Sequence, residues 1–236
     1  METRIASRTE VSRNKPRLSV AIVRDKSGSM AGNPIESENK AIEKFLEQKN
    51  IGITGRRTDI CIVGFDSNAY VEMDWVQMDQ ATPELDNNAS GMTDLDSGIM
   101  LALDKLKNKR MQDNALGIPP SAPLLIVLTD GAPTSSIERS VEEINMRLQK
   151  KDKNGLNTFM MMSIFMDDPQ LTESERETAL KTLSRYSGGV FTANTRQYNE
   201  IFSFIHDSIK AIHESGGTQK VLVNPQEHGM KYVTLN

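Results

Sequence analysis

Three oxygen-bearing side chains alternate in a short segment near the start of the chain. Asp25, Ser27 and Ser29 lie within residues 23–30, Val-Arg-Asp-Lys-Ser-Gly-Ser-Met, directly after an apolar run that is typical of a buried strand. Hard divalent cations take oxygen ligands in a near-octahedral shell, so one carboxylate and two hydroxyls with this spacing can converge on one ion. The segment is therefore a candidate metal site.

Two later segments offer further ligands for the same ion. Thr93, in Ser-Gly-Met-Thr-Asp, carries a hydroxyl at an expected helix start, and Asp130 follows a second apolar run in Leu-Ile-Val-Leu-Thr-Asp-Gly. In an open parallel sheet the ligand crevice lies at the carboxyl ends of the strands, so Asp25 and Asp130 meet there if their strands are neighbours. The predicted metal ligands are Asp25, Ser27, Ser29, Thr93 and Asp130.

The same residue types also serve ordinary local structure. Ser, Thr and Asp frequently cap helices or form turns, and each segment taken alone would be explained in this way. Asp94 and Asp96, next to Thr93, either extend the acidic site or complement the dipole of the helix that begins there, and we favour the second interpretation. Asp66 is expected to form a turn rather than bind metal.

The segments together resemble the metal-ion-dependent adhesion site of the von Willebrand factor A (VWA) family, which reads Asp-x-Ser-x-Ser, then Thr, then Asp. Ser-Gly-Ser-Met followed by Gly-Asn-Pro-Ile-Glu at residues 32–36, with Thr-Asp-Gly-Ala-Pro-Thr at residues 129–134, is most similar to bacterial intracellular members of the tellurium-resistance TerY type. The resemblance covers residues 17–215. Arg24 and Lys26 depart from the pattern, because a neutral residue is common there, and either side chain would weaken cation binding if it pointed inward.

The resemblance implies a role for each ligand. Ser27 and Ser29 would be direct hydroxyl ligands, Thr93 a direct or water-bridged one, and Asp25 and Asp130 carboxylates that often act through water. A Glu or Asp from a partner protein would fill the open coordination position. An all-oxygen, hydroxyl-rich set suits Mg²⁺ or Mn²⁺ better than Ca²⁺, which takes longer bonds and more ligands.

Composition is typical of a folded globular protein. The chain has 236 residues, of which 37% are hydrophobic and 25% charged, with 28 basic against 32 acidic side chains. No long run of one charge sign predicts a nucleic-acid or membrane-surface partner. Residues 1–17 lack the apolar core of a signal peptide and no stretch approaches the ~18 apolar residues of a membrane span, so we expect a cytoplasmic protein. The single cysteine, Cys61, is expected to be buried.

Strand-like and helix-like segments alternate along the chain. This alternation predicts an α/β fold: a doubly wound, mostly parallel central sheet with helices on both faces, which is the Rossmann-like VWA fold. Residues 59–65 and 69–76, around the turn-forming Asp-Ser-Asn, are expected to form a hairpin that supplies one antiparallel edge strand. The other expected strands are residues 18–24, 124–129, 157–166 and 189–192. The expected helices are residues 34–49, 93–109, 136–151, 172–184 and 197–214.

The chain is expected to contain one domain with two appendages. Residues 1–16 would be a polar tail, residues 17–215 the VWA domain and residues 216–236 a C-terminal extension. Within the extension, Val-Leu-Val at residues 221–223 is typical of an appended edge strand or a frayed tail. Residues 108–122, with one Gly and two Pro near their end, are expected to form a surface connection.

The leading functional hypothesis is a non-enzymatic interaction module. It would capture an acidic residue of a partner protein through bound Mg²⁺, and the resemblance implies a bacterial stress or tellurite-resistance complex. Pro133 and Thr134 lie at the rim of the predicted site, where loops of the family contact partners. A second hypothesis is an adaptor subunit of a AAA-type ATPase machine, a role that some intracellular VWA proteins fill.

A third hypothesis is a Mg²⁺-dependent phosphohydrolase that forms an aspartyl-phosphate intermediate on Asp25. Such enzymes usually need a second carboxylate two residues after the nucleophile, and Ser27 stands there. The chain also lacks the Gly-x-x-x-x-Gly-Lys and Gly-x-Ser-x-Gly motifs of nucleotide hydrolysis and serine-type acyl transfer. We therefore expect no enzymatic activity.

Overall fold

The computed structural model describes residues 16–47, 52–119, 121–187, 189–194, 197–216 and 223–234. Residues 1–15 of the expected polar tail lie outside these ranges, as do residues 221 and 222 of the expected Val-Leu-Val strand. The strands are β1 (Leu18–Asp25), β2 (Thr58–Phe65), β3 (Ala69–Gln77), β4 (Leu124–Thr129), β5 (Met160–Asp167), β6 (Val190–Asn194) and β7 (Lys231–Val233). The helices are α2 (Asn33–Glu47), α3 (Gly52–Arg56), α4 (Leu95–Ala115), α5 (Glu138–Gln149), α6 (Glu173–Ser187) and α7 (Tyr198–Glu214), with 3-10 turns η1 (Gly28–Met30), η2 (Met78–Gln80) and η3 (Pro225–His228).

The strands of the described ranges form one sheet in the order β3-β2-β1-β4-β5-β6-β7. The five inner strands are parallel to one another, and β3 and β7 lie antiparallel at the two edges. The chain starts at the centre with β1, runs outward to β3, and then crosses back through α4 to β4 on the other side of β1. The doubly wound fold class is therefore confirmed, and the strand order reverses between β1 and β4.

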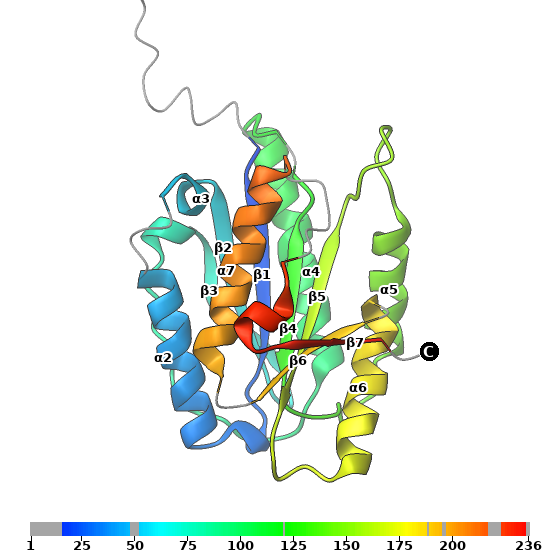
Figure 1. The fold of residues 1–236 in the computed structure, drawn as a ribbon. Helices are drawn as coiled ribbons and strands as arrows, with labels where there is room; N and C mark the ends of the chain where they lie inside the picture. Colours follow the sequence, from blue (N-terminus) through cyan, green and yellow to red (C-terminus); the bar gives the residue numbers. More distant parts are fainter. Residues whose placement is uncertain are drawn as a thin grey trace, which may run out of the picture.

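Helices cover both faces of the sheet (Figure 1). α2 and α7 pack on one face, and α4, α5 and α6 pack on the other. Successive residues of β1 alternate between the two cores, with Val20 and Ile22 facing α2 and α7, and Ala21 and Val23 facing α4. Because both faces are buried, these strands read as unbroken apolar runs rather than as alternating patterns.

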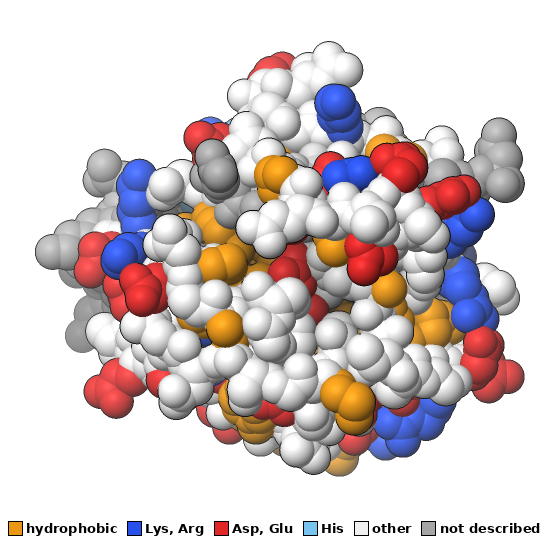
Figure 2. Space-filling view, turned by 90° about the horizontal axis from the view of Figure 1, so that it is seen from below, with side chains coloured by type: hydrophobic (Ala, Val, Ile, Leu, Met, Phe, Trp, Pro, Cys, Tyr) orange, Lys and Arg blue, Asp and Glu red, His pale blue; other side chains and the backbone are white. Residues whose placement is uncertain are grey.

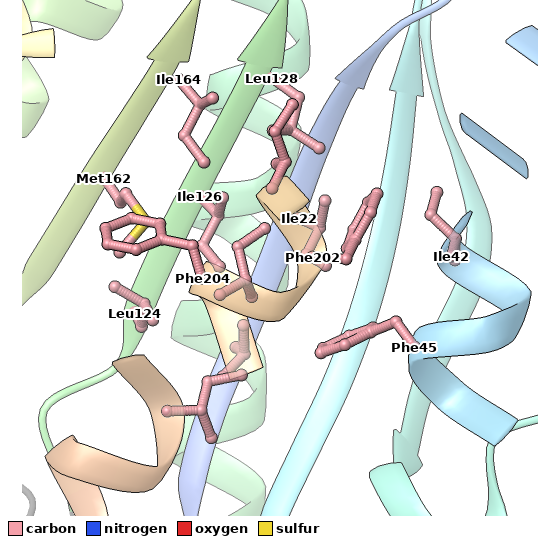
Figure 3. Packing of buried hydrophobic residues seen from close by; sticks show 14 of the residues in the cluster. Ile22, Ile42, Phe45, Leu124, Ile126, Leu128, Met162, Ile164, Phe202 and Phe204 are labelled. Carbon is pink, nitrogen blue, oxygen red and sulfur yellow. The ribbon is translucent and has the colours of Figure 1, made fainter. Parts of the chain in front are cut away.

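Aromatic side chains fill the core beneath α7. Phe45 of α2 and Phe202 of α7 point toward one another between their helices (Figure 3), and their ring centroids lie 5.4 Å apart. Phe204 packs over the start of β4 and β5, close to Leu124 and Met162. The second core holds Cys61, which is buried as the sequence predicted. Large rigid side chains of this kind hold the sheet and the helices in one arrangement.

Three elements differ from the sequence-based expectations. α4 continues to Ala115, six residues beyond its expected end, because residues 108–115 contain neither Gly nor Pro and the helix stops only before Gly117. α3 is a five-residue helix that was not predicted. The sheet also has a second antiparallel edge, because Lys231–Val233 pairs with β6.

Candidate metal centre

The predicted ligands gather at the switch point of the sheet. β1 and β4 are parallel neighbours, with Arg24 paired to Leu128, so the residues that follow these two strands emerge side by side. Figure 2 looks onto this edge: acidic side chains lie in a hollow near the middle of the face, and Lys and Arg side chains lie toward its margin. The strands are neighbours, which is the condition under which Asp25 and Asp130 were expected to meet, and a crevice at such a switch point is where open α/β sheets bind ligands.

Asp25 is held at the end of β1 by both carboxylate oxygens. Oδ1 accepts a hydrogen bond of 2.8 Å from the Ser27 backbone N–H, and Oδ2 accepts one of 2.5 Å from the Thr129 hydroxyl. The Asp25 side chain is completely buried. Thr129 was not among the predicted site residues, yet its hydrogen bond joins the end of β4 directly to Asp25, the first of the predicted ligands.

Ser29 joins the two strand ends. Its hydroxyl donates a hydrogen bond of 2.9 Å to Asp130 Oδ1 and lies 3.1 Å from the Ser27 hydroxyl. Asp130 is 3% exposed, whereas Ser29 lies at the surface. Four oxygen-bearing side chains from segments 101 residues apart therefore form one continuous cluster that is open on the Ser29 side.

Thr93 approaches the cluster on the chain segment that leads into α4. Its backbone N–H donates to the Thr134 hydroxyl at 3.1 Å, and the Thr134 N–H donates to the Thr93 carbonyl oxygen at 3.0 Å. This exchange fastens Thr93 to the loop that follows Asp130. In the described part of the chain, the hydrogen bonds of Thr93 run through its backbone, so its hydroxyl is not committed to another side chain.

Thr134 also has a structural role that the sequence did not predict. It is exposed beside the cluster, in keeping with the expected place near the rim, and it exchanges two hydrogen bonds with Thr93. Asp94 caps α4, because its carboxylate accepts hydrogen bonds from the Ser97 N–H and from the Ser97 and Ser135 hydroxyls. These bonds outweigh burial and hold the pKa of Asp94 below its ordinary value.

The neighbouring acidic residues are engaged in local structure. Asp96 joins α4 to α5 by accepting hydrogen bonds from the Ser140 N–H at 2.8 Å and from Arg139 Nε at 3.0 Å. Asp66 closes the turn between β2 and β3, where its carboxylate accepts the Asn68 N–H at 2.8 Å. Asp66 thus has the turn role expected from the sequence, whereas Asp96, which was expected to complement the dipole of α4, makes these bonds to the first turn of α5.

Burial raises the proton affinity of both carboxylates of the cluster. Burial raises the pKa of Asp25, against hydrogen bonds from Ser27 and Thr129 that lower it. Burial and the nearby Asp25 carboxylate raise the pKa of Asp130 to about 7. Two carboxylates and two hydroxyls that converge in this way form an all-oxygen set that fits a hard divalent cation, whose charge would balance theirs.

The ligand types of the cluster do not suit a softer metal. Among the residues that the structure describes, no group of three or more His, Cys, Asp and Glu side chains is arranged to hold a metal ion. A cation in this centre would therefore depend on hydroxyl oxygens as well as on the two carboxylates. This is the chemistry of Mg²⁺ and Mn²⁺ rather than of Zn²⁺, which prefers nitrogen and sulfur ligands.

Arg24 and Lys26 do not enter the centre. Adjacent strand residues point to opposite faces, and the Arg24 guanidinium lies on the α2 side, with Nε 2.7 Å from Glu72 Oε2. Lys26 Nζ lies 3.0 Å from the same carboxylate and 2.6 Å from Asp86 Oδ1. The sequence raised the possibility that these cations weaken metal binding, and the structure places both in ion pairs on the far side of β1.

No helix within the described ranges has the length and apolar character needed to cross a membrane. A model of the von Willebrand factor type A domain matches residues 19–203 of the chain. Over 119 residues the chain is 36% identical to calcium-activated chloride channel regulator 1 of Macaca mulatta, a match that covers 48% of this chain and 12% of that protein. The chain therefore spans only a small part of the length of that relative.

Solved structures share the same architecture at low sequence identity. The vWF domain of the type V pili tip protein Mfa5 from Porphyromonas gingivalis has a TM-score of 0.55 and 10% identity, covering 89% of this chain and 99% of that one. The PilB minor pilin from Streptococcus sanguinis has a TM-score of 0.54 and 14% identity, covering 84% and 62%. The ArnB paralog VWA2 from Sulfolobus acidocaldarius has a TM-score of 0.52 and 13% identity, covering 83% and 46%. At these identities the likeness concerns the fold alone.

Proposed function

The chain belongs to the von Willebrand factor type A domain family, and we propose that it acts as a metal-dependent protein-interaction module. Domains of this family are mostly interaction or adhesion modules rather than enzymes. In our proposal one Mg²⁺ or Mn²⁺ is held by the cluster at the ends of β1 and β4, and an acidic residue of a partner protein completes its coordination. The proposed ligands are Asp25, Ser27, Ser29, Thr93 and Asp130.

One observation carries this proposal. The Ser29 hydroxyl bridges to Asp130 while Asp25 and Ser27 lie in the same hydrogen-bonded cluster, although nothing in their local structure requires the two segments to meet. Side chains that only capped a helix or closed a turn would satisfy their own segments. Oxygen ligands that converge from two strand ends on a surface hollow form a site for a cation.

The charge of the centre favours an acidic partner. Two carboxylates offset the charge of a divalent cation, and the hydroxyl ligands add no further negative charge, so an ion with an open coordination position can still accept one anionic ligand. Mg²⁺ usually retains several waters and is reached from solvent on one side, and Ser29 marks the exposed side here. A Glu or Asp carboxylate from a partner can replace one of those waters.

Phosphoryl transfer through Asp25 is not supported. An aspartyl nucleophile needs a free carboxylate oxygen that faces the substrate. Both oxygens of Asp25 accept hydrogen bonds, from Ser27 and Thr129, and the side chain is fully buried. The arrangement suits an anchored ligand of a metal shell, direct or through water, better than a nucleophile.

The cellular setting is a further part of the proposal, and it is supported by the sequence resemblance alone. We propose a cytoplasmic complex of the stress or tellurite-resistance type, with an adaptor role for a AAA-type ATPase as the alternative. Co-purification from the source cells separates the two, because an ATPase that is recovered with the wild type and lost with Asp25→Ala would favour the adaptor role.

Titration of metal-free protein with Mg²⁺ and Mn²⁺ by calorimetry tests the metal centre. We expect saturable binding of one ion per chain, and Asp130→Ala should abolish it by removing one of two charged ligands. Asp168→Ala is the matched control, since Asp168 follows the neighbouring strand β5 and acts on Asp130 through charge alone. The control should weaken binding only slightly.

The partner carboxylate is tested with pairs of short peptides that differ by one Glu-to-Gln exchange. We expect Mg²⁺-dependent retention of a Glu peptide that is lost with its Gln counterpart and with Asp130→Ala. A wild-type protein that binds no cation even at tens of millimolar would overturn the proposal and leave a metal-independent scaffold. Cation binding that Asp130→Ala leaves intact would place the ion elsewhere.

A further inference from the structure

A ring of polar side chains lies behind the metal centre, on the opposite face of β1. Arg24 Nη1 donates to Asn39 Oδ1 at 2.6 Å, and Asn39 Nδ2 donates to the Asp86 carbonyl oxygen at 2.8 Å. Lys26 Nζ joins the Asp86 carboxylate to Glu72, and Glu72 returns to Arg24 Nε at 2.7 Å. The ring thus connects β1, α2, β3 and the segment that precedes α4. It contains both residues that flank Asp25.

Glu72 reaches this ring because β3 is irregular at that point. Val63 of β2 pairs with Val71, and the preceding residue Ile62 pairs with Met73, so Glu72 is an extra residue on β3. A β-bulge of this kind bends a strand and redirects a side chain, and bulges are common beside functional sites. Here the bulge sends a carboxylate from the edge strand across β2 to β1.

A glycine in β2 leaves room for that carboxylate. Gly64 pairs with Arg24 on one side and with Tyr70 on the other, so it lies between the ring and the edge strand. A Cβ atom at Gly64 would lie 3.0 Å from Glu72 Cδ and 3.0 Å from a Tyr70 ring carbon. Any larger residue at this position would push the Glu72 side chain away from its partners.

The ring neutralises two buried cations next to the metal centre. Arg24 and Lys26 are nearly inaccessible to water, and Glu72 is 6% exposed. Charges interact strongly in such surroundings because little water screens them. The carboxyl group of Glu38, also fully buried, lies 3.5 Å from the Arg24 guanidinium on the α2 side.

The ring is also fastened to two of the ligand segments. The Lys26 carbonyl oxygen accepts a hydrogen bond of 2.9 Å from the Ser90 N–H, and the Gly28 N–H donates to the Gly91 oxygen at 3.2 Å. Lys26 lies between Asp25 and Ser27, and Gly91 precedes Thr93 by two residues. A change in the position of Lys26 would therefore move both segments.

We propose that Glu72 is a positioning residue of the metal centre. It holds Arg24 and Lys26 on the far side of β1 and, together with Asp86, offsets their charge, so that Asp25 faces the cation site without a competing positive group. This inference rests on the proposed function, because it concerns the affinity of the same centre for its cation. It assigns a role to a residue of the edge strand that touches none of the five proposed ligands.

The variant Glu72→Gln tests the proposal, because it keeps the size of the side chain and removes its charge. We expect the dissociation constant for Mn²⁺ to rise by roughly 10-fold or more, as is common for residues that orient metal ligands. Metal-free protein is titrated with Mn²⁺, and the electron paramagnetic resonance signal of the free ion reports binding. Glu84→Gln is the control, since it removes one exposed negative charge from the segment that also contains Asp86.

A second substitution separates positioning from general stability. Glu72→Gln leaves Lys26 with one carboxylate partner instead of two. Adding Lys26→Met to this variant removes the positive charge itself. We expect the double variant to recover a clear part of the lost Mn²⁺ affinity, although it should unfold at no higher temperature than Glu72→Gln. A residue that only stabilised the fold would show no such recovery.

The outcomes distinguish this inference from the proposed function. If the wild type binds no Mn²⁺, the metal centre itself is wrong. If the wild type binds and Glu72→Gln binds as tightly as Glu84→Gln, the role of Glu72 is overturned while the metal centre stands. Should Glu72→Gln fail to fold, Asp86→Asn decides, because its side chain is 60% exposed and its change buries no unpaired group. Its affinity should fall several-fold, and an unchanged value would refute the ring.

Discussion

At the scale of single residues, the centre contains buried carboxyl groups whose ionised form is unfavourable without a nearby positive charge. Burial and the neighbouring Asp25 carboxylate raise the pKa of Asp130 to about 7 from its ordinary value of 3.8. Burial also raises the pKa of Glu38, on the other side of β1, to about 7, although the positive charge of Arg24 acts to lower that pKa. Below about pH 7 these two groups are mostly protonated in the folded, metal-free protein.

The stability of the metal-free protein should therefore fall as the pH rises. A carboxyl whose pKa is higher in the folded than in the unfolded chain binds more protons when folded, so the free energy of unfolding decreases between pH 3.8 and about 7. Asp130 should contribute about 1–3 kcal/mol to this decrease. Urea unfolding at pH 5 and pH 8 without divalent cations measures it.

Asp130→Asn identifies the group responsible. The variant keeps an oxygen that accepts the Ser29 hydrogen bond, but its side chain cannot ionise. Its free energy of unfolding should therefore decrease less between pH 5 and pH 8 than that of the wild type. Glu38→Gln gives the separate contribution of Glu38. Adding Mg²⁺ should restore stability at pH 8 in the wild type and not in Asp130→Asn. Equal wild-type stability at both pH values would contradict the charge state described for the centre.

At the scale of elements, the start of α4 positions one side of the centre. Thr93 and the capping residue Asp94 precede this helix, and Gly98 in its first turn packs directly on β2. A Cβ atom at Gly98 would lie 2.9 Å from a ring carbon of Phe65 and 3.0 Å from the Phe65 Cβ atom. Phe65 is itself fully buried, so it has little room to move. The absence of a side chain at Gly98 allows α4 to lie close to the sheet.

Gly98→Ala should therefore destabilise the protein even though alanine favours helices. The helix-propensity gain of about 1 kcal/mol is opposed by overpacking, which typically costs about 1–3 kcal/mol in a filled core. We expect a lower denaturation midpoint and weaker Mn²⁺ binding, because the shifted helix start carries Thr93 with it. Lys107→Ala, on the exposed side of the same helix, is the control and should leave both unchanged. A more stable Gly98→Ala protein would show that the helix is free to move outward.

At the scale of the whole molecule, the C-terminal segment completes the sheet. β7 pairs with β6, Met230 is buried, and the Tyr232 ring lies 4.8 Å from Phe191 between centroids. Gly189 makes this possible, because a Cβ atom there would collide with the Tyr232 hydroxyl. The segment was expected to be a C-terminal extension that forms an appended edge strand or a frayed tail, and its described part forms an edge strand on β6.

Removal of the residues after 216 should separate stability from metal binding. Burial of Met230 alone is worth about 1.5–3 kcal/mol, and a loss of that size lowers the thermal midpoint by about 2–4 °C per kcal/mol in a chain of this length. Mn²⁺ affinity should stay within about two-fold of the wild type, since β7 is separated from β4 by two strands. Loss of Mn²⁺ affinity in a truncated protein that remains folded would reveal coupling across the sheet.

Much of the fold and of the candidate centre follows from local pattern. Apolar runs interrupted by helical spacing predict the α/β class, and the Asp-x-Ser-x-Ser spacing after a strand predicts that Asp25, Ser27 and Ser29 lie together. Asp130 was found because it also follows a strand. The metal role of all these residues stays a prediction until the titration is done.

The relations that local pattern could not supply are all long-range. Thr129 donates a hydrogen bond to Asp25, which is 104 residues away in the sequence. Lys26 donates one to Glu72, 46 residues away, because of a β-bulge that the hydrophobic pattern of the strand does not predict. The second edge strand formed from three residues with no distinctive composition. Amino-acid spacing reports which face of its own helix or strand a side chain occupies, because that depends on backbone geometry. Which distant segments meet depends on strand order and on packing of the whole core, so these contacts emerge only when the chain is folded.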